Sequence, residues 1–349
     1  MEFEVEKYLL EFKKPSGTSR GILYNKPSWI FRITDKNGIS GVGEFSVIPG
    51  LSPDYEDYYT YELQVQKAID FLKNNIQNSS ETNFLIRQFN AEFSEYPSLI
   101  FGVETALLDL KNGGNEIIFD NDFSKGLTSI PINGLIWMGS EEEMQIQIDE
   151  KLKLGYKTIK IKIGAIDFRK ELSLIQKIRE KYSSKEVIIR VDANGAFSFE
   201  ESKQVLLKLK ELDVHSIEQP IKAGQFQQMK ELCEFNIVPI ALDEELIGIY
   251  DKQEKINLLD FIKPQYIILK PSLHGGISGC SEWIELAEQR NIGWWITSAL
   301  ESSIGLNAIA QFTANYNVQI PQGLGTGGLY KNNLPSKLVI KEGYLKLQK

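Results

Sequence analysis

Short apolar runs recur along the middle of the chain, and each run ends in an ionisable residue. The residues at these ends are Lys160 and Lys162, Asp192, Glu218, Asp243 and Lys270. Successive ends lie 30, 26, 25 and 27 residues apart (162 to 192, 192 to 218, 218 to 243 and 243 to 270). A strand, a helix and two loops need about that many residues. The spacing therefore predicts a series of βα units with charged side chains at the C-terminal ends of the strands.

The order of the predicted elements divides the chain into two regions. Before about residue 125, the pattern predicts strands over residues 5–12, 29–33 and 39–45 and then helices over 55–75 and 98–112. Strands followed by helices indicate an α+β domain. From residue 130 to about 314, strand and helix patterns alternate. This alternation indicates a (β/α)8-type barrel whose chemistry lies at the C-terminal rim.

Composition and charge exclude several classes of protein. The 349 residues are 42% hydrophobic and 25% charged, as in globular proteins, and no apolar run approaches the roughly 18 residues of a membrane span. A formal net charge of −8 argues against a nucleic-acid partner, which would favour a basic surface. Two cysteines, and an N-terminus without a signal-peptide pattern, favour a cytoplasmic setting.

Histidine is scarce, since the chain has only His215 and His274. A Ser-His-Asp triad or a multi-histidine zinc site is therefore disfavoured. We interpret His215 as a packing or surface residue. His274 follows Lys270 in a glycine-rich rim loop, where a structural role and a substrate contact both fit the pattern.

Two other segments fall near the predicted rim. The sequence GLGTGG at residues 323–328 lacks the Lys-Ser/Thr of a phosphate-binding loop, so a turn is the better interpretation. The sequence TSALESS at residues 297–303 follows a predicted strand at 293–296. It offers hydroxyl groups and a helix N-terminus that would suit a substrate carboxylate.

Three of the strand-end residues are carboxylates on neighbouring strands. Asp192, Glu218 and Asp243 would converge at one rim and offer hard oxygen ligands without histidine or cysteine. That donor set suits Mg²⁺, with Mn²⁺ as a substitute. The alternative is that each acidic residue only caps the helix that follows it, and three in register make this alternative weaker.

Lys160 and Lys162 are two positions apart on one predicted strand, so both side chains point to the same face. Burying two lysines against the helix layer would be costly, and the interior rim is therefore favoured. Neighbouring ammonium groups disfavour each other's charged form, which favours a lysine that acts as a base at neutral pH. Lys270 would approach the same space from the opposite side. A solvated, lysine-rich edge is the alternative.

Several motifs together resemble the enolase superfamily and, within it, the muconate-lactonising subgroup. They are FGVETALLD at 101–109, KIK at 160–162, DAN at 192–194, IEQP at 217–220, ALDE at 241–244, LKP at 269–271 and the segment 297–306. The resemblance covers nearly the whole chain. It implies an α/β barrel, namely a (β/α)7β TIM-like barrel over residues 126–325 with an α+β capping domain over residues 1–125. Residues 326–349, with a strand–turn–strand pattern at 338–347, would return to the capping domain.

The resemblance also implies roles for individual residues. Lys162 is the implied general base, Lys270 its partner on the opposite face, and Lys160 the neighbour that adjusts Lys162. Asp192, Glu218 and Asp243 are the implied Mg²⁺ ligands. The implied substrate contacts are Asn133, Asn194, Ser298, Leu300, Ser302 and Gly21, and Asn194 also supports the metal ligands. The loops at residues 15–21 and 47–53 are either lids over the barrel mouth or ordinary surface turns.

The resemblance finally implies an enzyme that acts on a small-molecule carboxylate, as a monomer or homo-oligomer, with no nucleic-acid or membrane partner. The nearest activity is the magnesium-dependent syn dehydration of 2-succinyl-6-hydroxy-2,4-cyclohexadiene-1-carboxylate to 2-succinylbenzoate in menaquinone biosynthesis. N-succinylamino acid racemisation and dipeptide epimerisation stay open as alternatives. Dipeptide epimerases typically carry an Asp-x-Asp pair late in the barrel, and the sequence TSALE at 297–301 argues against them. A scaffold that only binds a partner is disfavoured because the lysines and acidic residues are all present.

Overall fold

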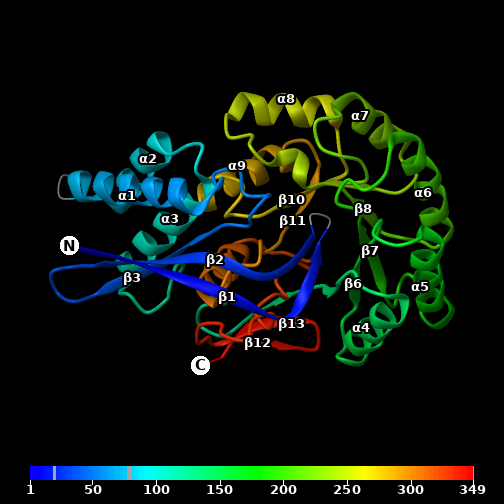
Figure 1. The fold of residues 1–349 in the computed structure, drawn as a ribbon, viewed down its shortest axis with the longest axis horizontal. Helices are drawn as coiled ribbons and strands as arrows, with labels where there is room; N and C mark the ends of the chain where they lie inside the picture. The colour runs from blue at the N-terminus through cyan, green and yellow to red at the C-terminus, as the bar shows by residue number, and fades with distance from the viewer. Residues whose placement is uncertain (19–20, 77–80, 349) are drawn as a thin grey trace.

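A parallel sheet of seven strands forms the centre of the molecule, and its strands follow one another in chain order (Figure 1). The computed structural model describes residues 1–18, 21–76 and 81–348. The seven strands are β5 Gly134–Ile136, β6 Thr158–Lys162, β7 Ile188–Asp192, β8 Ser216–Glu218, β9 Ile240–Leu242, β10 Tyr266–Leu269 and β11 Gly293–Ile296. Their register places Lys162 beside Asp192 and Asp192 beside Glu218. The charged strand ends predicted from the sequence therefore share one rim.

A short irregular segment lies between the two edge strands, β5 and β11. Gln322 accepts a hydrogen bond from the amide of Asn133 (3.0 Å), and Gly323 donates one to the carbonyl of Ile296 (2.8 Å). These residues form isolated bridges and no regular strand, because Pro321 has no amide hydrogen and glycine weakens a strand. The predicted TIM-like architecture is confirmed for the seven strands and their order. Regular strand pairing does not close the sheet within the described residues.

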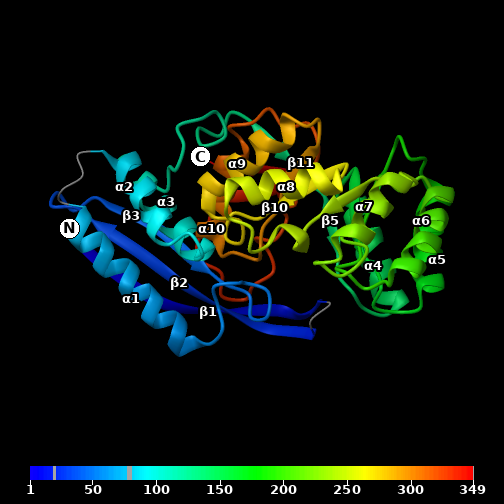
Figure 2. The same cartoon turned by 90° about the horizontal axis from the view of Figure 1, so that it is seen from above.

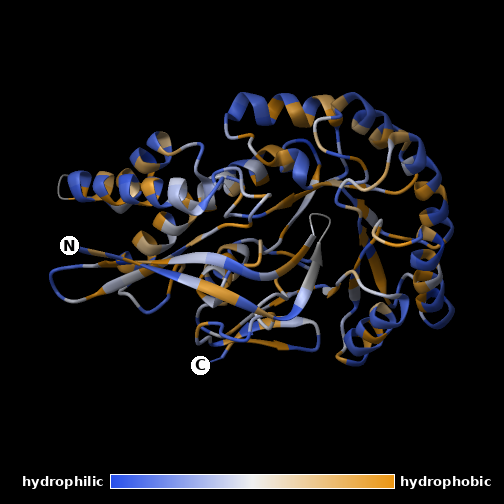
Figure 3. Cartoon of the chain, viewed as in Figure 1, coloured by the Kyte–Doolittle hydropathy of each residue, from blue (hydrophilic) through white to orange (hydrophobic). Residues whose placement is uncertain are grey.

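One helix follows each of the seven strands, and α4 to α8 curve around the outside of the sheet (Figures 1 and 2). The helices are α4 Glu141–Lys153, α5 Phe168–Lys181, α6 Phe199–Glu211, α7 Phe226–Phe235, α8 Lys252–Ile262, α9 Gly276–Glu288 and α10 Ser303–Thr313; a short 3-10 turn, Glu244–Leu246, precedes α8. Ser140 and Ser198 begin α4 and α6 with capping boxes. Hydrophilic and hydrophobic residues alternate along the outer helices, as expected where one face packs on the sheet (Figure 3). In the described ranges, no helix has the length and apolar character to cross a membrane.

The N-terminal region combines an antiparallel sheet with three helices, and the sequence predicts the sheet and two of these helices. The strands are β1 Glu2–Thr18, β2 Gly21–Thr34 and β3 Ser40–Ser46, and the helices are α1 Tyr58–Asn75, α2 Thr82–Glu92 and α3 Pro97–Lys111. Helix α2 is not predicted from the sequence. It is short, and Glu81 at its start makes no side-chain cap, so it lacks the usual signal of a helix N-terminus.

Helix α3 lies unusually close to β3 because two glycines meet there. A Cβ atom added to Gly43 would lie 2.0 Å from the carbonyl oxygen of Gly102. Only glycine permits this approach without displacing the backbone. The contact belongs to a core that includes Phe31, Phe45 and Phe89, all fully buried.

The C-terminal segment corrects one expectation. The predicted strand–turn–strand forms as β12 Leu338–Lys341 and β13 Tyr344–Leu347, but β13 pairs with β4 Ser129–Pro131 and not with the N-terminal sheet. Only the preceding residues run beside β1, where the amide of Lys13 donates to the carbonyl of Leu329 (2.8 Å). Three-residue β4 leaves an open edge beside the seven-stranded sheet, and the hairpin occupies that edge.

Two buried glutamates of the N-terminal region cap α9 and α10, the helices that follow β10 and β11. Glu44 on β3 accepts hydrogen bonds from the amides of Ser302 and Gly305 (both 3.0 Å) at the start of α10. Glu104 on α3 accepts one from the amide of Ile277 (2.5 Å) at the start of α9. Helix N-termini favour negative charge, so these contacts attach the two regions electrostatically.

We predict that Glu44→Gln lowers the free energy of unfolding by about 2 kcal/mol, because it removes the charge from hydrogen bonds that have no water to replace them. Urea denaturation at neutral pH measures the loss. Glu6→Gln, at an exposed position on β1, is the matched control and should change the free energy by less than about 0.5 kcal/mol. Equal values for the two variants would show that the Glu44 contacts do not stabilise the structure.

Candidate active site

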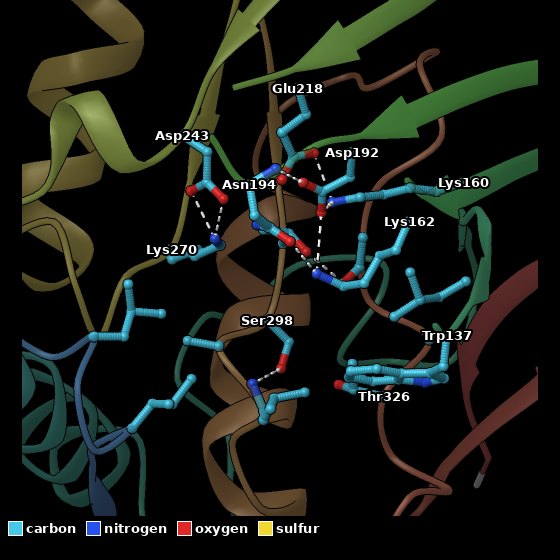
Figure 4. A pocket seen from close by; sticks show the side chains of 18 of the residues that line it. Trp137, Lys160, Lys162, Asp192, Asn194, Glu218, Asp243, Lys270, Ser298 and Thr326 are labelled. Atoms are coloured by element: carbon cyan, nitrogen blue, oxygen red, sulfur yellow. Dashed lines mark hydrogen bonds and ion pairs between the residues drawn. The ribbon is translucent and has the colours of Figure 1, made fainter. Parts of the chain in front are cut away.

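A cavity of about 140 Å³ lies at the C-terminal ends of the parallel strands (Figure 4). Its wall contains all six strand-end residues predicted from the sequence: Lys160, Lys162, Asp192, Glu218, Asp243 and Lys270. Both β6 lysines face this cavity, so the prediction of a shared interior face is confirmed. The solvated-edge alternative is wrong for these residues, because the lysine side chains are only 11–12% exposed.

Each lysine lies against a carboxylate. Lys160 Nζ lies 3.0 Å from Asp192 Oδ2 and 2.5 Å from Glu218 Oε2. Lys162 Nζ lies 3.3 Å from Asp192 Oδ2. Lys270 Nζ contacts both carboxylate oxygens of Asp243, at 2.6 Å for Oδ1. Buried ions are stable only with such partners, so the six residues form one charge-compensated cluster.

The proximity of these groups shifts their pKa values in opposite directions. Burial alone would raise the pKa of Asp192, but the ammonium groups of Lys160 and Lys162 outweigh burial and hold it below its ordinary value. Burial together with the negative charge of Asp192 raises the pKa of Glu218. Burial alone would lower the pKa of Lys160, but Asp192 and Glu218 hold it above its ordinary value. Lys160 is therefore a fixed cation in this arrangement.

Asn194 orients Lys162. Its Oδ1 accepts a hydrogen bond from Lys162 Nζ (2.7 Å), and its Nδ2 donates to Glu244 Oε1 (3.0 Å). Asn194 has a positive φ of 44°, a conformation that asparagine tolerates better than most residues. The indole ring of Trp137 lies 6.0 Å from Lys162 Nζ on another side. The ammonium group thus has neighbours on two segments of the cavity wall, the end of β7 and the residue after β5.

His274 positions Lys270 and does not reach the cavity. It is fully buried, and its Nδ1 accepts a hydrogen bond from the backbone amide of Lys270 (2.8 Å). Burial lowers the pKa of His274 to about 3, so the ring stays neutral at physiological pH. Of the two roles left open by the sequence, the structure supports the structural one.

Asp192, Glu218 and Asp243 are the kind of ligands that a hard divalent cation prefers. All offer oxygen, and Glu218 Oε1 is buried with no hydrogen-bond partner in the described structure. As the side chains stand, no three His, Cys, Asp or Glu residues among those described are close enough to hold an ion together. Each of the three carboxylates contacts a lysine ammonium group, so a cation bound there would compete with these contacts.

Four of the six predicted substrate contacts line the cavity: Asn133, Asn194, Ser298 and Leu300. Ser302 does not, because its hydroxyl and amide both bond to Glu44. The α10 N-terminus therefore holds a protein carboxylate, and the expectation that it receives a substrate carboxylate is not supported. Gly21 begins β2 opposite Thr18 and is not part of the cavity wall.

Of the two candidate lid loops, the one at residues 47–53 contributes side chains to the cavity wall. From the loop at residues 47–53, Ile48, Pro49 and Leu51 line the cavity and give it an apolar side. The loop at residues 15–21 includes residues 19 and 20, which lie outside the described part of the chain. Leu23, just beyond it on β2, also lines the cavity.

The cavity wall also contains three residues that are not predicted from the sequence: Trp137, Glu244 and Thr326. Glu244 directly follows Asp243 and was open to prediction from that neighbour. Trp137 follows β5, whose end, like that of β11, carries no ionisable residue, and therefore gave no signal. Thr326 lies in the glycine-rich segment, which forms the predicted turn but also contributes a hydroxyl to the wall.

The chain belongs to the enolase C-terminal domain-like family, whose model matches residues 143–349. It is 48% identical to the o-succinylbenzoate synthase of Desulfotalea psychrophila, over 99% of this chain and 98% of that protein. The crystal structure of MenC from Desulfotalea psychrophila superposes with a TM-score of 0.85 at 44% identity, covering 99% of both chains. A substrate-liganded L-Ala-D/L-Glu epimerase from Bacillus subtilis has a TM-score of 0.85 at 22% identity, covering 99% of this chain and 96% of that chain, and shares the fold. The resemblance to the enolase superfamily is confirmed.

We predict that Lys160→Met lowers the free energy of unfolding by about 3–5 kcal/mol, because it leaves Asp192 and Glu218 buried with less compensating charge. Urea denaturation in EDTA measures this without a cation that substitutes for the lysine.

The control for that experiment is Lys208→Met, which breaks the exposed Lys208–Glu211 pair (2.8 Å). It should cost less than about 1 kcal/mol, since exposed pairs contribute little. If the two variants lose equal stability, the buried cluster is not held by Lys160.

Proposed function

We propose that this chain catalyses the o-succinylbenzoate synthase reaction, the syn dehydration of 2-succinyl-6-hydroxy-2,4-cyclohexadiene-1-carboxylate to 2-succinylbenzoate in menaquinone biosynthesis. The observation that carries the proposal is a cavity with Lys162 and Lys270 on opposite strands of the sheet and three carboxylates between them. The similarity of the whole chain to an o-succinylbenzoate synthase supports this reaction among those that such a cavity could perform.

Lys162 is the base in this proposal. In its neutral form it takes the proton from the ring carbon that bears the carboxylate. It then gives that proton to the hydroxyl group on the neighbouring carbon, which leaves as water while the ring becomes aromatic. One lysine serves both steps because the two groups leave from the same face. The hydrogen bond from Lys162 to Asn194 (2.7 Å) holds the nitrogen at the cavity wall.

Lys270 supplies positive charge on the other side of the substrate. Burial alone would lower the pKa of Lys270, but Asp243 and Glu244 outweigh burial and hold it above its ordinary value. A lysine held in its charged form stabilises the negative charge that develops when the proton leaves. His274 fixes the backbone from which Lys270 extends.

Asp192, Glu218 and Asp243 are the residues that would hold Mg²⁺, with Mn²⁺ as a substitute. Their oxygen-only donor set and the unpartnered Glu218 Oε1 support this assignment. When bound, the ion supplies positive charge that stabilises a substrate carboxylate as it accepts electron density. The backbone amide of Asn194 donates a hydrogen bond to Asp192 Oδ1 (3.1 Å) and keeps that carboxylate oriented.

The composition of the cavity wall favours dehydration over dipeptide epimerisation. The acidic residues in the wall are the three proposed ligands and the adjacent Glu244, all on the β7–β9 side. On the β11 side, Glu301 is fully buried and accepts hydrogen bonds from Ser272 and Ser298 (both 2.6 Å). Among the described residues, a substrate ammonium group therefore finds no free carboxylate on that side of the cavity wall.

The proposal extends to the organisation of the chain. Residues 1–125 form a capping domain, residues 126–325 a (β/α)7β barrel completed by the segment around Gln322, and residues 326–349 a C-terminal segment. Two buried free thiols, Cys233 and Cys280, fit the reducing conditions of the cytoplasm.

We predict that the purified protein with Mg²⁺ converts the cyclohexadiene substrate to 2-succinylbenzoate, measured by the absorbance change on aromatisation. EDTA should reduce the rate by at least about a thousandfold, because the developing charge loses its strongest counter-charge, and added Mg²⁺ should restore it. Racemisation of N-succinylamino acids, followed by optical rotation, should be slower than dehydration.

Faster racemisation than dehydration would assign the chain to the racemases of the same family. Full turnover in EDTA, after metal analysis of the protein shows no bound divalent ion, would overturn the metal assignment while leaving the lysine assignment to be judged separately.

A further inference from the structure

Two polar side chains in the cavity wall each have a side-chain oxygen that forms no hydrogen bond within the described structure. Asn133 is 3% exposed and Thr326 is 5% exposed, and neither Asn133 Oδ1 nor Thr326 Oγ1 has a hydrogen-bond partner in the described structure. Buried polar groups are nearly always bonded, so each such group in a binding cavity calls for a ligand atom that completes it.

The other hydroxyl groups of the wall on the same side already form hydrogen bonds. Ser298 Oγ donates to Glu301 (2.6 Å) and accepts from the amide of Leu300 (3.0 Å). Thr297 Oγ1 donates to the carbonyl of Gly323 (3.0 Å). On this side of the cavity, Asn133 Oδ1 and Thr326 Oγ1 are thus the buried side-chain oxygens without a hydrogen-bond partner among the described residues.

These two residues belong to neighbouring segments. The amide of Asn133 bonds to Gln322, and a Cβ atom added to Gly325 would lie 3.5 Å from the carbonyl oxygen of Asn133. Thr326 follows that glycine directly. In the close view, Thr326 and Trp137 lie on the opposite side of the cavity from Glu218 and Asp243 (Figure 4).

We propose that Asn133 and Thr326 form a second binding subsite, which reads the oxygen atoms of the substrate's succinyl arm through neutral hydrogen bonds. The inference rests on the proposed function, because the arm belongs to that substrate. The lysine–carboxylate cluster binds the reacting ring carboxylate, so a substrate that spans the cavity places its arm at the other end. A hydroxyl and a carboxamide both donate to carbonyl or carboxylate oxygen.

Thr326→Val tests the subsite because it removes the hydroxyl and keeps the side-chain shape. Calorimetry with the full-length Mg²⁺-loaded protein compares three stable ligands: 2-succinylbenzoate, 2-butyrylbenzoate and 2-methylbenzoate. We expect the Kd of 2-succinylbenzoate to rise about tenfold, the value of one good hydrogen bond, while the Kd of 2-methylbenzoate stays within about twofold. Thr326→Ser should bind like the wild type.

Binding of 2-butyrylbenzoate identifies which oxygen of the succinyl arm accepts the hydrogen bond from Thr326. 2-Butyrylbenzoate keeps the ketone of the arm and lacks its terminal carboxylate. An equal loss with this ligand assigns the contact to the ketone, and no loss assigns it to the carboxylate. Both results support an arm-binding subsite.

Two further variants guard against a merely structural effect. Asn133→Leu, on the other segment, should show the same ligand-selective loss. Thr158→Val is the matched control, since Thr158 Oγ1 is also buried and unpartnered but lies outside the cavity wall. It should bind all three ligands like the wild type.

Equal losses for 2-succinylbenzoate and 2-methylbenzoate, or no loss for either, would overturn the subsite. A wild-type protein that binds 2-methylbenzoate but gains nothing from the succinyl arm would also overturn it. A wild-type protein without dehydration activity would instead count against the proposed function, so the two failures are distinguishable.

Discussion

Six ionisable side chains lie almost wholly out of water at one rim of the sheet, and the rest of the site depends on the contacts that pair them. Three ammonium groups each contact a carboxylate within 3.3 Å or less. An unpaired ion at such a position would cost several kcal/mol. The parallel sheet makes the pairing possible, because Lys162, Asp192 and Glu218 occupy one register at three adjacent strand ends.

The N-terminal region keeps this cluster covered and is itself fixed by charge. Glu104 and Glu44 cap α9 and α10, the helices that follow the loops of Lys270 and Ser298. The apolar residues Ile48 and Leu51 from the same region then close one side of the cavity. The contacts that join the two regions therefore also hold two walls of the site, and chemistry there proceeds beside a surface that excludes water.

The sequence was sufficient for features that depend on local period and strand register. The spacing of Lys162, Asp192 and Glu218 predicted one shared rim, because parallel strands in chain order bring such residues together. Features that depend on distant contacts could not be predicted. Ser302 bonds to Glu44, 258 positions away, and Thr326 reaches the cavity only through the path of an irregular segment. The partner strand of the C-terminal hairpin was likewise set by a free sheet edge that no local pattern reveals.

The central claim is that Lys162 moves the proton, and a single substitution tests it most directly. Lys162→Ala should reduce kcat for dehydration by at least about a thousandfold, in the range expected for loss of a general base. It should still bind 2-succinylbenzoate with a Kd close to that of the wild type, because Asp192 retains Lys160 as its partner. Wild-type kcat in a folded Lys162→Ala protein would contradict the account.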